Sequence, residues 1–206
     1  MSTYTKPDHW AIRAQKEGYP ARSVYKLKEI DEKFGLLSRG RQNILDLGAA
    51  PGSWSLYVLR RLSAQKNGAR RLSAIDLAPL SRQYDQGLFD RDNFHFLQGD
   101  MTSPEIREAI EADGPFSLIL SDAAPATTGN RQIDTLRSLA LAETVLDYAE
   151  QFLLPGGNLA VKVFQGGDTA ALLARLRLSF KTARSFKPEA CRAESFETYY
   201  LGLERF

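Results

Sequence analysis

Three aspartates have the positions that ligand-binding acids occupy in α/β proteins. Each lies at the end of a short apolar segment that is expected to form a strand, and the three are Asp76, Asp100 and Asp122. Ligands of open α/β sheets bind beyond the carboxyl ends of the strands, so these acids would meet in one crevice. One such aspartate alone would be interpreted as a turn residue. Three at equivalent positions indicate a binding site.

A loop of small residues, 48–52, joins a predicted strand to a predicted helix and would border the same crevice. Glycines let the backbone approach a ligand, and the helix N-terminus offers free N–H groups. The loop lacks the G-x-G-x-x-G spacing of dinucleotide-binding proteins and the Lys-Ser/Thr pair of a phosphate loop. The excess of acid disfavours a pyrophosphate. The crevice suits a ligand with a cationic group, a ribose diol and an amino-bearing base, which describes S-adenosylmethionine. Asp76 would accept from the ribose hydroxyls, and Asp100 from the adenine amino group.

Lys162 is unusual because it lies inside an apolar strand, between Val161 and Val163. A buried lysine must be paired or must lose its charge. With a lowered pKa it could remove a proton as a general base. As an ammonium it could instead steer an oxygen and stabilise a developing alkoxide. Its sequence position leaves both roles open, as well as a purely structural ion pair with a strand-end aspartate.

The elements around these residues alternate, which predicts a mainly parallel sheet with helices on both faces. The final two strands are expected to form an antiparallel edge. Residues 1–20 are polar and irregular, and a poorly ordered extension is expected there; a turn is expected at Asn67-Gly68, and residues 155–157 should end the long helix. The predicted strands are 44–47, 71–75, 94–97, 116–120, 159–164, 180–186 and 198–203. The predicted helices are 21–34, 53–63, 104–112, 133–153 and 169–177.

Composition limits the class of protein. The 206 residues suit one domain, 1–206, and no apolar run approaches the ~20 residues of a membrane span. The N-terminus has no signal-peptide core, and Cys191 is the only cysteine, so a reduced cytoplasmic setting is expected. Cys191 itself is interpreted as a small packing residue.

Charge is unevenly distributed although the net charge is only +2. Residues 1–41 carry nine Lys/Arg against five Asp/Glu, residues 175–206 carry seven against four, and the middle is acidic. If the two basic ends meet on one face, that face would attract a polyanion.

Four segments of this sequence resemble the FtsJ/RrmJ-type ribose 2′-O-methyltransferases. The resemblance extends from about residue 22 to the C-terminus, and its motifs are residues 46–55, 98–100, 121–125 and 161–166. It implies a Rossmann-like class I methyltransferase fold with a seven-stranded sheet. It further implies that S-adenosylmethionine is the methyl donor. The implied target is a uridine ribose in the A loop of 23S ribosomal RNA, within the large ribosomal subunit.

The resemblance also assigns site residues. The family's Lys-Asp-Lys-Glu catalytic set falls on Lys26, Asp122, Lys162 and Glu197, with Glu194 as an alternative to Glu197. The cofactor positions fall on Gly52, Trp54, Asp76, Asp100 and Asp122. No metal and no obligate protein partner are implied. Three positions depart from the family pattern, namely Ser53, Ala126 and Phe196.

This resemblance predicts a role for the two basic ends of the chain, because they could bind RNA phosphates beside the crevice. The candidate residues are Arg13, Lys16, Arg22, Lys28, Arg184 and Lys187. Two other functions stay open: 2′-O-methylation of tRNA or of an mRNA cap, and a non-catalytic RNA-binding ribosome assembly factor. The loop spacing disfavours a nucleotide-dependent dehydrogenase.

Overall fold

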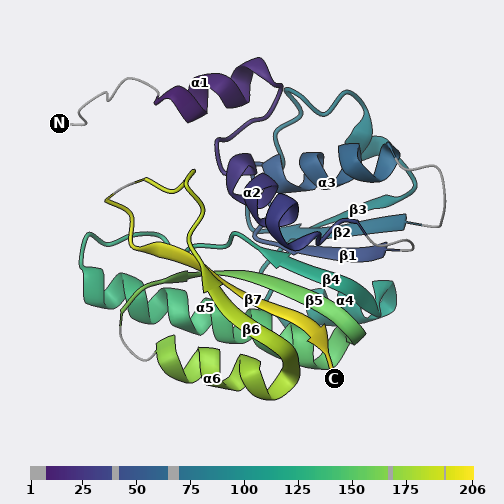
Figure 1. The fold of residues 1–206 in the computed structure, drawn as a ribbon. Coiled ribbons are helices and arrows are strands. Elements are labelled where there is room, and N and C mark those ends of the chain that lie inside the picture. Colours follow the sequence, from purple (N-terminus) through teal and green to yellow (C-terminus); the bar gives the residue numbers. More distant parts are fainter. Residues whose placement is uncertain (1–7, 39–41, 65–69, 167–168, 193) are drawn as a thin grey trace.

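The computed structural model describes residues 8–206 apart from 39–41, 65–69, 167–168 and 193 (Figure 1). Seven strands form one sheet in the order β3-β2-β1-β4-β5-β7-β6. The strands are β1 (Gln42–Leu47), β2 (Arg70–Asp76), β3 (Phe94–Gln98), β4 (Phe116–Ser121), β5 (Leu153–Phe164), β6 (Phe180–Phe186) and β7 (Glu197–Arg205). The helices are α1 (His9–Lys16), α2 (Val24–Phe34), α3 (Ser53–Ser63), α4 (Pro104–Asp113), α5 (Arg131–Phe152), α6 (Thr169–Ser179) and the 3-10 helix η1 (Leu88–Asp90).

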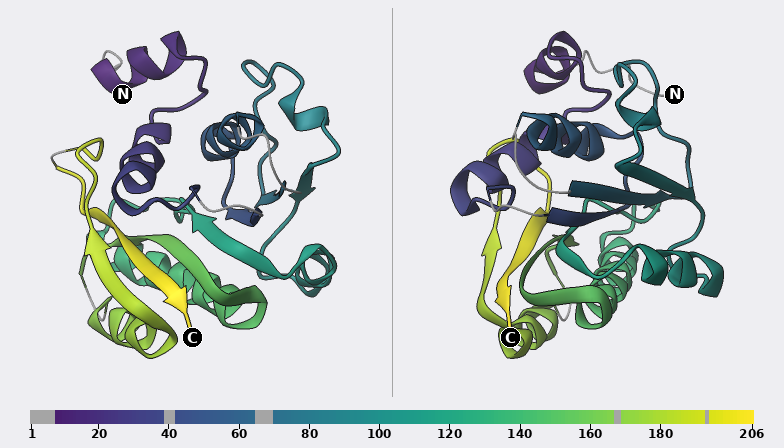
Figure 2. Two further views of the ribbon diagram at one scale, coloured as in Figure 1. Left: turned by 45° about the vertical axis from the view of Figure 1, so that its right-hand side comes forward. Right: turned by 90° about the vertical axis from the view of Figure 1, so that its right-hand side faces the viewer.

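The sheet lies between two helical layers, as predicted. Figures 1 and 2 show α2 and α3 on one face, with α1 beyond them, and α4, α5 and α6 on the other. Each face has its own apolar cluster: Leu118 and Leu120 point to the α2–α3 side, and Ile119 points to the α5 side. Both faces of the central strands are therefore buried, which explains their unbroken apolar runs.

The strand order creates a switch point between β1 and β4. From β1 the chain adds β2 and β3 on one side, and it then crosses to β4 and β5 on the other. The strands β3 to β5 run parallel through the middle of the sheet. The helices that follow β1 and β4 must diverge at this point, which leaves a crevice at the carboxyl ends of those strands.

The predicted antiparallel edge is confirmed, and the structure gives the order of its strands. The last strand, β7, lies between β5 and β6 and runs antiparallel to both. The edge strand is therefore β6. This insertion has a consequence for the site, because it places β7 directly beside Lys162 of β5.

Two local predictions were wrong. The long helix ends at Phe152, just before residues 155–157, but the next strand begins at Leu153 and not at residue 159 as predicted, so β5 includes these residues. The β4–β5 register shifts between Phe116 and Leu118. The N-terminal segment is not irregular throughout, since His9–Lys16 forms α1, capped by the Asp8 side chain. Residues 1–7 and the predicted turn at Asn67-Gly68 lie outside the described residues.

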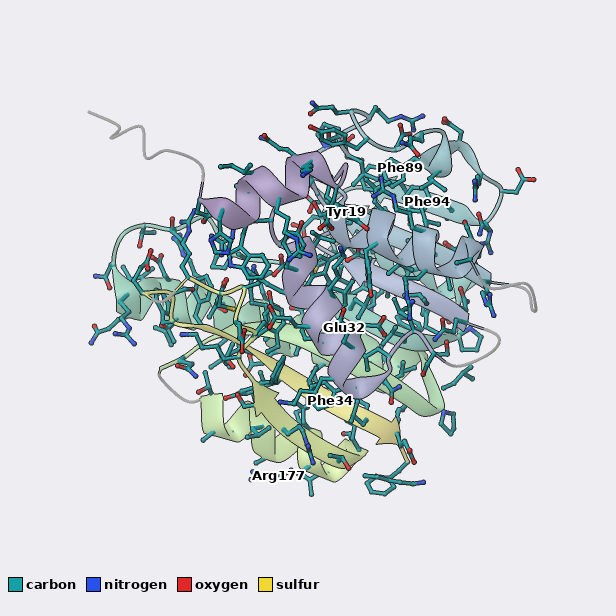
Figure 3. The ribbon with its side chains drawn as sticks, turned by 45° about the horizontal axis from the view of Figure 1, so that its top comes forward. Tyr19, Glu32, Phe34, Phe89, Phe94 and Arg177 are labelled. Carbon is teal, nitrogen blue, oxygen red and sulfur yellow. The ribbon has the colours of Figure 1, made fainter. Side chains whose placement is uncertain are left out.

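Contacts with distant aromatic residues explain why α1 forms. The Trp10 ring packs 4.8 Å from the Tyr25 ring, and Arg13 lies 4.8 Å above Tyr25. Figure 3 labels Tyr19, which follows α1 and lies beneath the Arg60 guanidinium at 4.4 Å. These partners come from α2 and α3, so local periodicity could not reveal the helix.

Candidate active site

A cavity of about 790 Å³ opens at the carboxyl ends of the central strands. The β1–α3 loop forms one wall and the segment after β4 forms another. Asp76, Asp100, Asp122 and Lys162 all line it, so the fold brings together the three predicted acids and the strand lysine. Further wall residues are Ser23, Gly48, Ala50, Pro51, Leu77, Gly99, Met101, Thr102, Ala123, Ala124, Pro125, Ala126, Arg137, Ala140, Leu141 and Thr144.

Two glycines shape the loop after β1. Gly48 has a φ of 78°, and a Cβ on it would lie 2.5 Å from the Cβ of Ala123 in the facing wall. Gly52 has a φ of 105° and precedes α3 directly. Both backbone conformations strongly favour glycine. The close approach at Gly48 lets the β1 and β4 loops meet at the base of the cavity.

Asp76 and Asp100 accept hydrogen bonds from neutral groups of the surrounding loops. Asp76 accepts from Ala50 N at 2.9 Å and from Ala78 N at 2.8 Å, so it ties the β1 loop to its own loop. Asp100 accepts from the amide and the hydroxyl of Thr102, each at 2.8 Å. Those hydrogen bonds lower the pKa of Asp100. It is therefore an ionised hydrogen-bond acceptor at neutral pH.

Lys162 and Asp122 form the centre of the charged network. Lys162 Nζ lies 3.1 Å from Asp122 Oδ1 and donates to the Asp122 carbonyl oxygen at 2.5 Å. Tyr199, opposite Lys162 in the β5–β7 ladder, donates its hydroxyl to Asp122 Oδ1 at 2.6 Å. Burial and the Asp122 carboxylate raise the pKa of Tyr199 well above its usual value, so this hydroxyl keeps its proton.

The second ion pair of the network joins Lys26 of α2 to Glu197 of β7 at 2.7 Å. Lys26 is only 8% exposed although it is a lysine. Burial would raise the pKa of Asp122, but Lys162 and Lys26 lower it overall. Burial would also lower the pKa of Lys26, but Asp122 and Glu197 raise it overall. The two lysines thus keep Asp122 ionised in a buried setting.

The structure distinguishes the two candidate glutamates. Glu197 opens β7 and contacts Lys26, whereas Glu194 is exposed in the loop before it. Within the described residues, Glu194 makes no salt bridge. Glu197 is therefore the glutamate that the fold brings to Lys26, Asp122 and Lys162.

Gly52 and Trp54 do not line the cavity. The Trp54 side chain is 2% exposed, and its Nε1 donates to the carbonyl oxygen of Ser23 at 2.9 Å. Its ring lies 5.8 Å from that of Tyr199. Trp54 thus supports the wall residue Ser23 from behind. Ser53, where the chain departs from the family pattern, bonds to both the amide and the carbonyl of Ala21, at 2.8 and 3.1 Å.

Sequence reasoning missed two polar residues, Tyr199 and Asp46. Asp46 is fully buried at the end of β1; one carboxylate oxygen accepts from Ser55 at 2.7 Å and the other has no hydrogen-bond partner. Burial raises the pKa of Asp46 to about 7. The signal for Asp46 was present, because it is the one acid inside an apolar strand. Nothing in the sequence indicated that Tyr199 would face Lys162.

The two basic ends of the chain meet, a condition that the charge distribution had left open. Glu29 of α2 accepts from the backbone amides of Glu189 and Ala190 in the β6–β7 loop, at 2.6 and 2.8 Å. Asp8 forms ion pairs with Arg22 and Arg192. Figure 1 shows this loop beside α2.

The six predicted phosphate-binding residues divide into two groups. Arg13 and Lys28 are paired with Glu17, and Arg22 with Asp8, so these three already neutralise acids. The other three, Lys16, Arg184 and Lys187, are exposed.

No three His, Cys, Asp or Glu side chains lie together as a metal site in the described part of the chain. None of the described helices is both long and apolar enough to cross a membrane.

The sheet order, the antiparallel β7 and a cavity at the β1–β4 switch point define a Rossmann-like class I methyltransferase. The family model described as FtsJ-like methyltransferase matches residues 19–205, and this chain belongs to that family of enzymes.

Known relatives extend along nearly the whole chain. A protein of Treponema denticola named ribosomal RNA large subunit methyltransferase E is 51% identical over 201 residues, covering 98% of this chain and 96% of its own. A protein of the same name from Nitratidesulfovibrio vulgaris is 43% identical over 205 residues, covering 98% and 96%. The crystal structure of a ribosomal RNA methyltransferase from Plasmodium falciparum has a TM-score of 0.76 at 28% identity, covering 91% and 98%.

Proposed function

We propose that this enzyme transfers a methyl group from S-adenosylmethionine to the 2′-hydroxyl of a uridine in the A loop of 23S ribosomal RNA, within the large ribosomal subunit in the cytoplasm. The observation that carries the proposal is the buried network of Lys26, Asp122, Lys162 and Glu197 at the cavity wall. The names of the relatives support ribosomal RNA as the substrate.

The cavity fits the methyl donor. Its volume of about 790 Å³ lies within the usual range for ligand pockets, ~300–1,000 Å³. Asp76 at the end of β2 would accept from the ribose diol, and ionised Asp100 from the adenine amino group. The apolar walls, including Leu77 and Met101, would enclose the base. When bound, the donor supplies a methyl group on a cationic sulfur, and a crevice bordered by carboxylates favours that charge.

Lys162 is the group positioned to act on the ribose hydroxyl. Its two contacts to Asp122 use two of the three N–H groups that an ammonium carries, which leaves one for the hydroxyl oxygen. In that form Lys162 would orient the oxygen and stabilise its developing negative charge. In the neutral form it would accept the hydroxyl proton. Either role requires the oxygen to be held in line with the methyl group, so positioning contributes much of the acceleration.

Lys162 is held in place by its charged and polar neighbours, which are Asp122, Tyr199 and the Lys26–Glu197 pair. Asp122 fixes the Lys162 ammonium through its carboxylate and its carbonyl oxygen, and Tyr199 fixes the Asp122 carboxylate. Lys26 adds a second positive charge that keeps Asp122 ionised. Each group restrains its neighbour, so the network is preorganised before substrate arrives.

The deciding experiment offers tritium-labelled S-adenosylmethionine to purified large subunits, bare 23S RNA, tRNA and capped mRNA that all lack the modification. We expect label in 23S RNA, mapped to a ribose in the A loop by nuclease digestion. Label in tRNA or in the mRNA cap would show that the enzyme methylates another class of RNA. An absence of label in every RNA, with intact cofactor binding, would instead make the protein a non-catalytic assembly factor.

A further inference from the structure

An arginine and an aromatic ring form an exposed pair near the mouth of the site. The Arg131 guanidinium, at the first residue of α5, lies 5.1 Å from the centre of the Phe196 ring. Phe196 in turn meets Phe164 edge to face, with ring centres 4.7 Å apart at 65°. Phe164 is buried, Phe196 is half-buried and Arg131 is exposed. The pair is thus supported from below by Phe164 and open on its outer side.

The pair lies close to the reacting groups. Phe164 and Lys162 are two residues apart on β5, so they point to the same face of the sheet, about 7 Å apart along the strand. Phe196 directly precedes Glu197, and Glu197 is paired with Phe164 in the β5–β7 ladder. Gln165 N donates to the Phe196 carbonyl oxygen at 2.7 Å, which fixes the backbone at this point. The Phe196 ring is therefore held next to the charged network, one residue before Glu197.

Arg131 makes no salt bridge within the described residues, whereas Arg13 and Lys28, which also lie over aromatic rings, both pair with Glu17. An exposed guanidinium over an aromatic face presents a flat surface with a positive charge. Unstacked RNA bases bind to both kinds of surface, aromatic rings and guanidinium planes.

We infer that the Arg131–Phe196 pair binds a base of the RNA that neighbours the methylated nucleotide, by stacking. The inference rests on the proposed function, because it takes the RNA ribose to lie at Lys162. The ribose of the target nucleotide must enter the cavity, so the adjacent nucleotide is unstacked from it and lies against the rim of the cavity. The pair holds that neighbouring base, and Arg131 also attracts the adjoining phosphate. The pair therefore sets the position of the RNA strand relative to Lys162.

The test uses an A-loop RNA oligonucleotide carrying 2-aminopurine directly before or directly after the target uridine, bound in the presence of S-adenosylhomocysteine. The emission of 2-aminopurine falls when the base stacks. We expect one of the two labels to be quenched by the wild-type enzyme and not by Phe196→Leu, which keeps an apolar side chain but removes the ring. Phe196→Leu and Arg131→Ala should also raise KM for RNA by about 5-fold to 100-fold, with KM for S-adenosylmethionine unchanged.

Matched controls remove the same groups far from the cavity. Phe206→Leu removes an exposed ring at the C-terminus, and Arg177→Ala removes an exposed arginine near the end of α6, labelled in Figure 3. Both should behave as wild type. Equal quenching by wild type and Phe196→Leu at both positions, with equal KM for RNA, would overturn the inference. Failure of the proposed function has a different signature: wild-type enzyme would then transfer no methyl group to 23S RNA, whatever the emission shows.

Discussion

At the scale of single residues, the site depends on buried charges that are held by each other. Lys162 and Lys26 are 7% and 8% exposed, a burial that lysine tolerates only when it is paired. Their partners, Asp122 and Glu197, lie on different elements of the fold. The removal of one member therefore leaves another buried charge without a partner. The measured effect of such a variant includes the cost of that unpaired charge.

Lys162→Ala should abolish methyl transfer while cofactor binding persists. Loss of a group that orients or deprotonates the hydroxyl lowers kcat by about 10²–10⁴-fold. Tritium transfer measures kcat, and calorimetry with S-adenosylhomocysteine measures binding. Lys181→Ala, an exposed lysine of β6 paired with Glu204, is the matched control and should be fully active. Full activity of Lys162→Ala would remove Lys162 from the mechanism.

Asp76→Ala should weaken cofactor binding. The loss of hydrogen bonds to a charged acceptor should raise the dissociation constant about 10-fold to 100-fold. Asp76→Asn, which keeps one oxygen acceptor for the Ala50 amide, should lose less. Asp90→Ala, at an exposed aspartate of η1, serves as the control. An unchanged dissociation constant for Asp76→Ala by calorimetry would contradict the ribose-binding role.

Asp46→Asn should change how stability depends on pH. The folded protein keeps the Asp46 proton up to about pH 7, whereas the unfolded chain releases it near its ordinary value of 3.8. Between these values the unfolded state binds fewer protons, so this group makes wild-type stability fall as pH rises. The neutral amide has no such loss. The stability of Asp46→Asn relative to wild type should therefore rise between pH 4 and pH 8, by up to about 4 kcal/mol. Urea unfolding at both pH values measures it, and a constant difference would refute the assignment.

At the scale of elements, the site is assembled by the strand inserted between β5 and β6. Because β7 returns antiparallel beside β5, it places Tyr199 opposite Lys162 and Glu197 opposite Phe164. The α2 helix then packs over this face and delivers Lys26. Ser53 and Trp54 of α3 bond to Ala21 and Ser23, which anchors the start of α2 at the cavity.

The Lys26–Glu197 pair should act as one unit. Lys26→Ala and Glu197→Ala should each lower kcat, and the double variant should be little worse than either. A coupling free energy of about 1–3 kcal/mol is expected for residues in direct contact. Glu194→Ala, the nearby exposed glutamate, should retain wild-type kcat and provides the control. Strictly additive losses would mean that the two residues act separately.

At the scale of the whole molecule, the two basic ends of the chain meet beside the cavity, although the middle of the sequence is acidic. The N-terminal helices and the β6–β7 loop are linked through Glu29 and Asp8. Several of their cations neutralise local acids, and the exposed ones are left to attract RNA phosphates. Lys16, Arg184 and Lys187 belong to this second group.

Binding of RNA should therefore depend steeply on salt. Between 50 and 200 mM salt, KM for RNA should rise at least about tenfold through counterion release, while KM for S-adenosylmethionine changes little. Arg184→Ala should reduce the slope of log KM against log salt by about 1. Arg177→Ala, on α6, should leave the slope unchanged. A KM for RNA that is indifferent to salt would contradict a phosphate-binding face.

The sequence alone determined the α/β class, the boundaries of α3 and β6, the acids at the strand ends and the presence of a lysine inside β5. These features are local: an apolar run, a glycine-bounded loop and a charge inside a strand can each be recognised within about ten residues. Gly35 at the end of α2 is a local feature of the same kind, since it adopts the left-handed conformation common at helix C-termini.

Only the tertiary structure decided which side chains meet. It placed β7 inside the sheet, brought Glu197 rather than Glu194 to Lys26, packed α1 against Tyr25, and buried the Trp54 side chain against Ser23. Each of these depends on contacts between residues far apart in the chain. Such contacts are stabilised by burial and by charge pairing between distant segments, and neither produces a periodic pattern in the sequence. The acids at the strand ends, by contrast, are positioned by the backbone of their own strands.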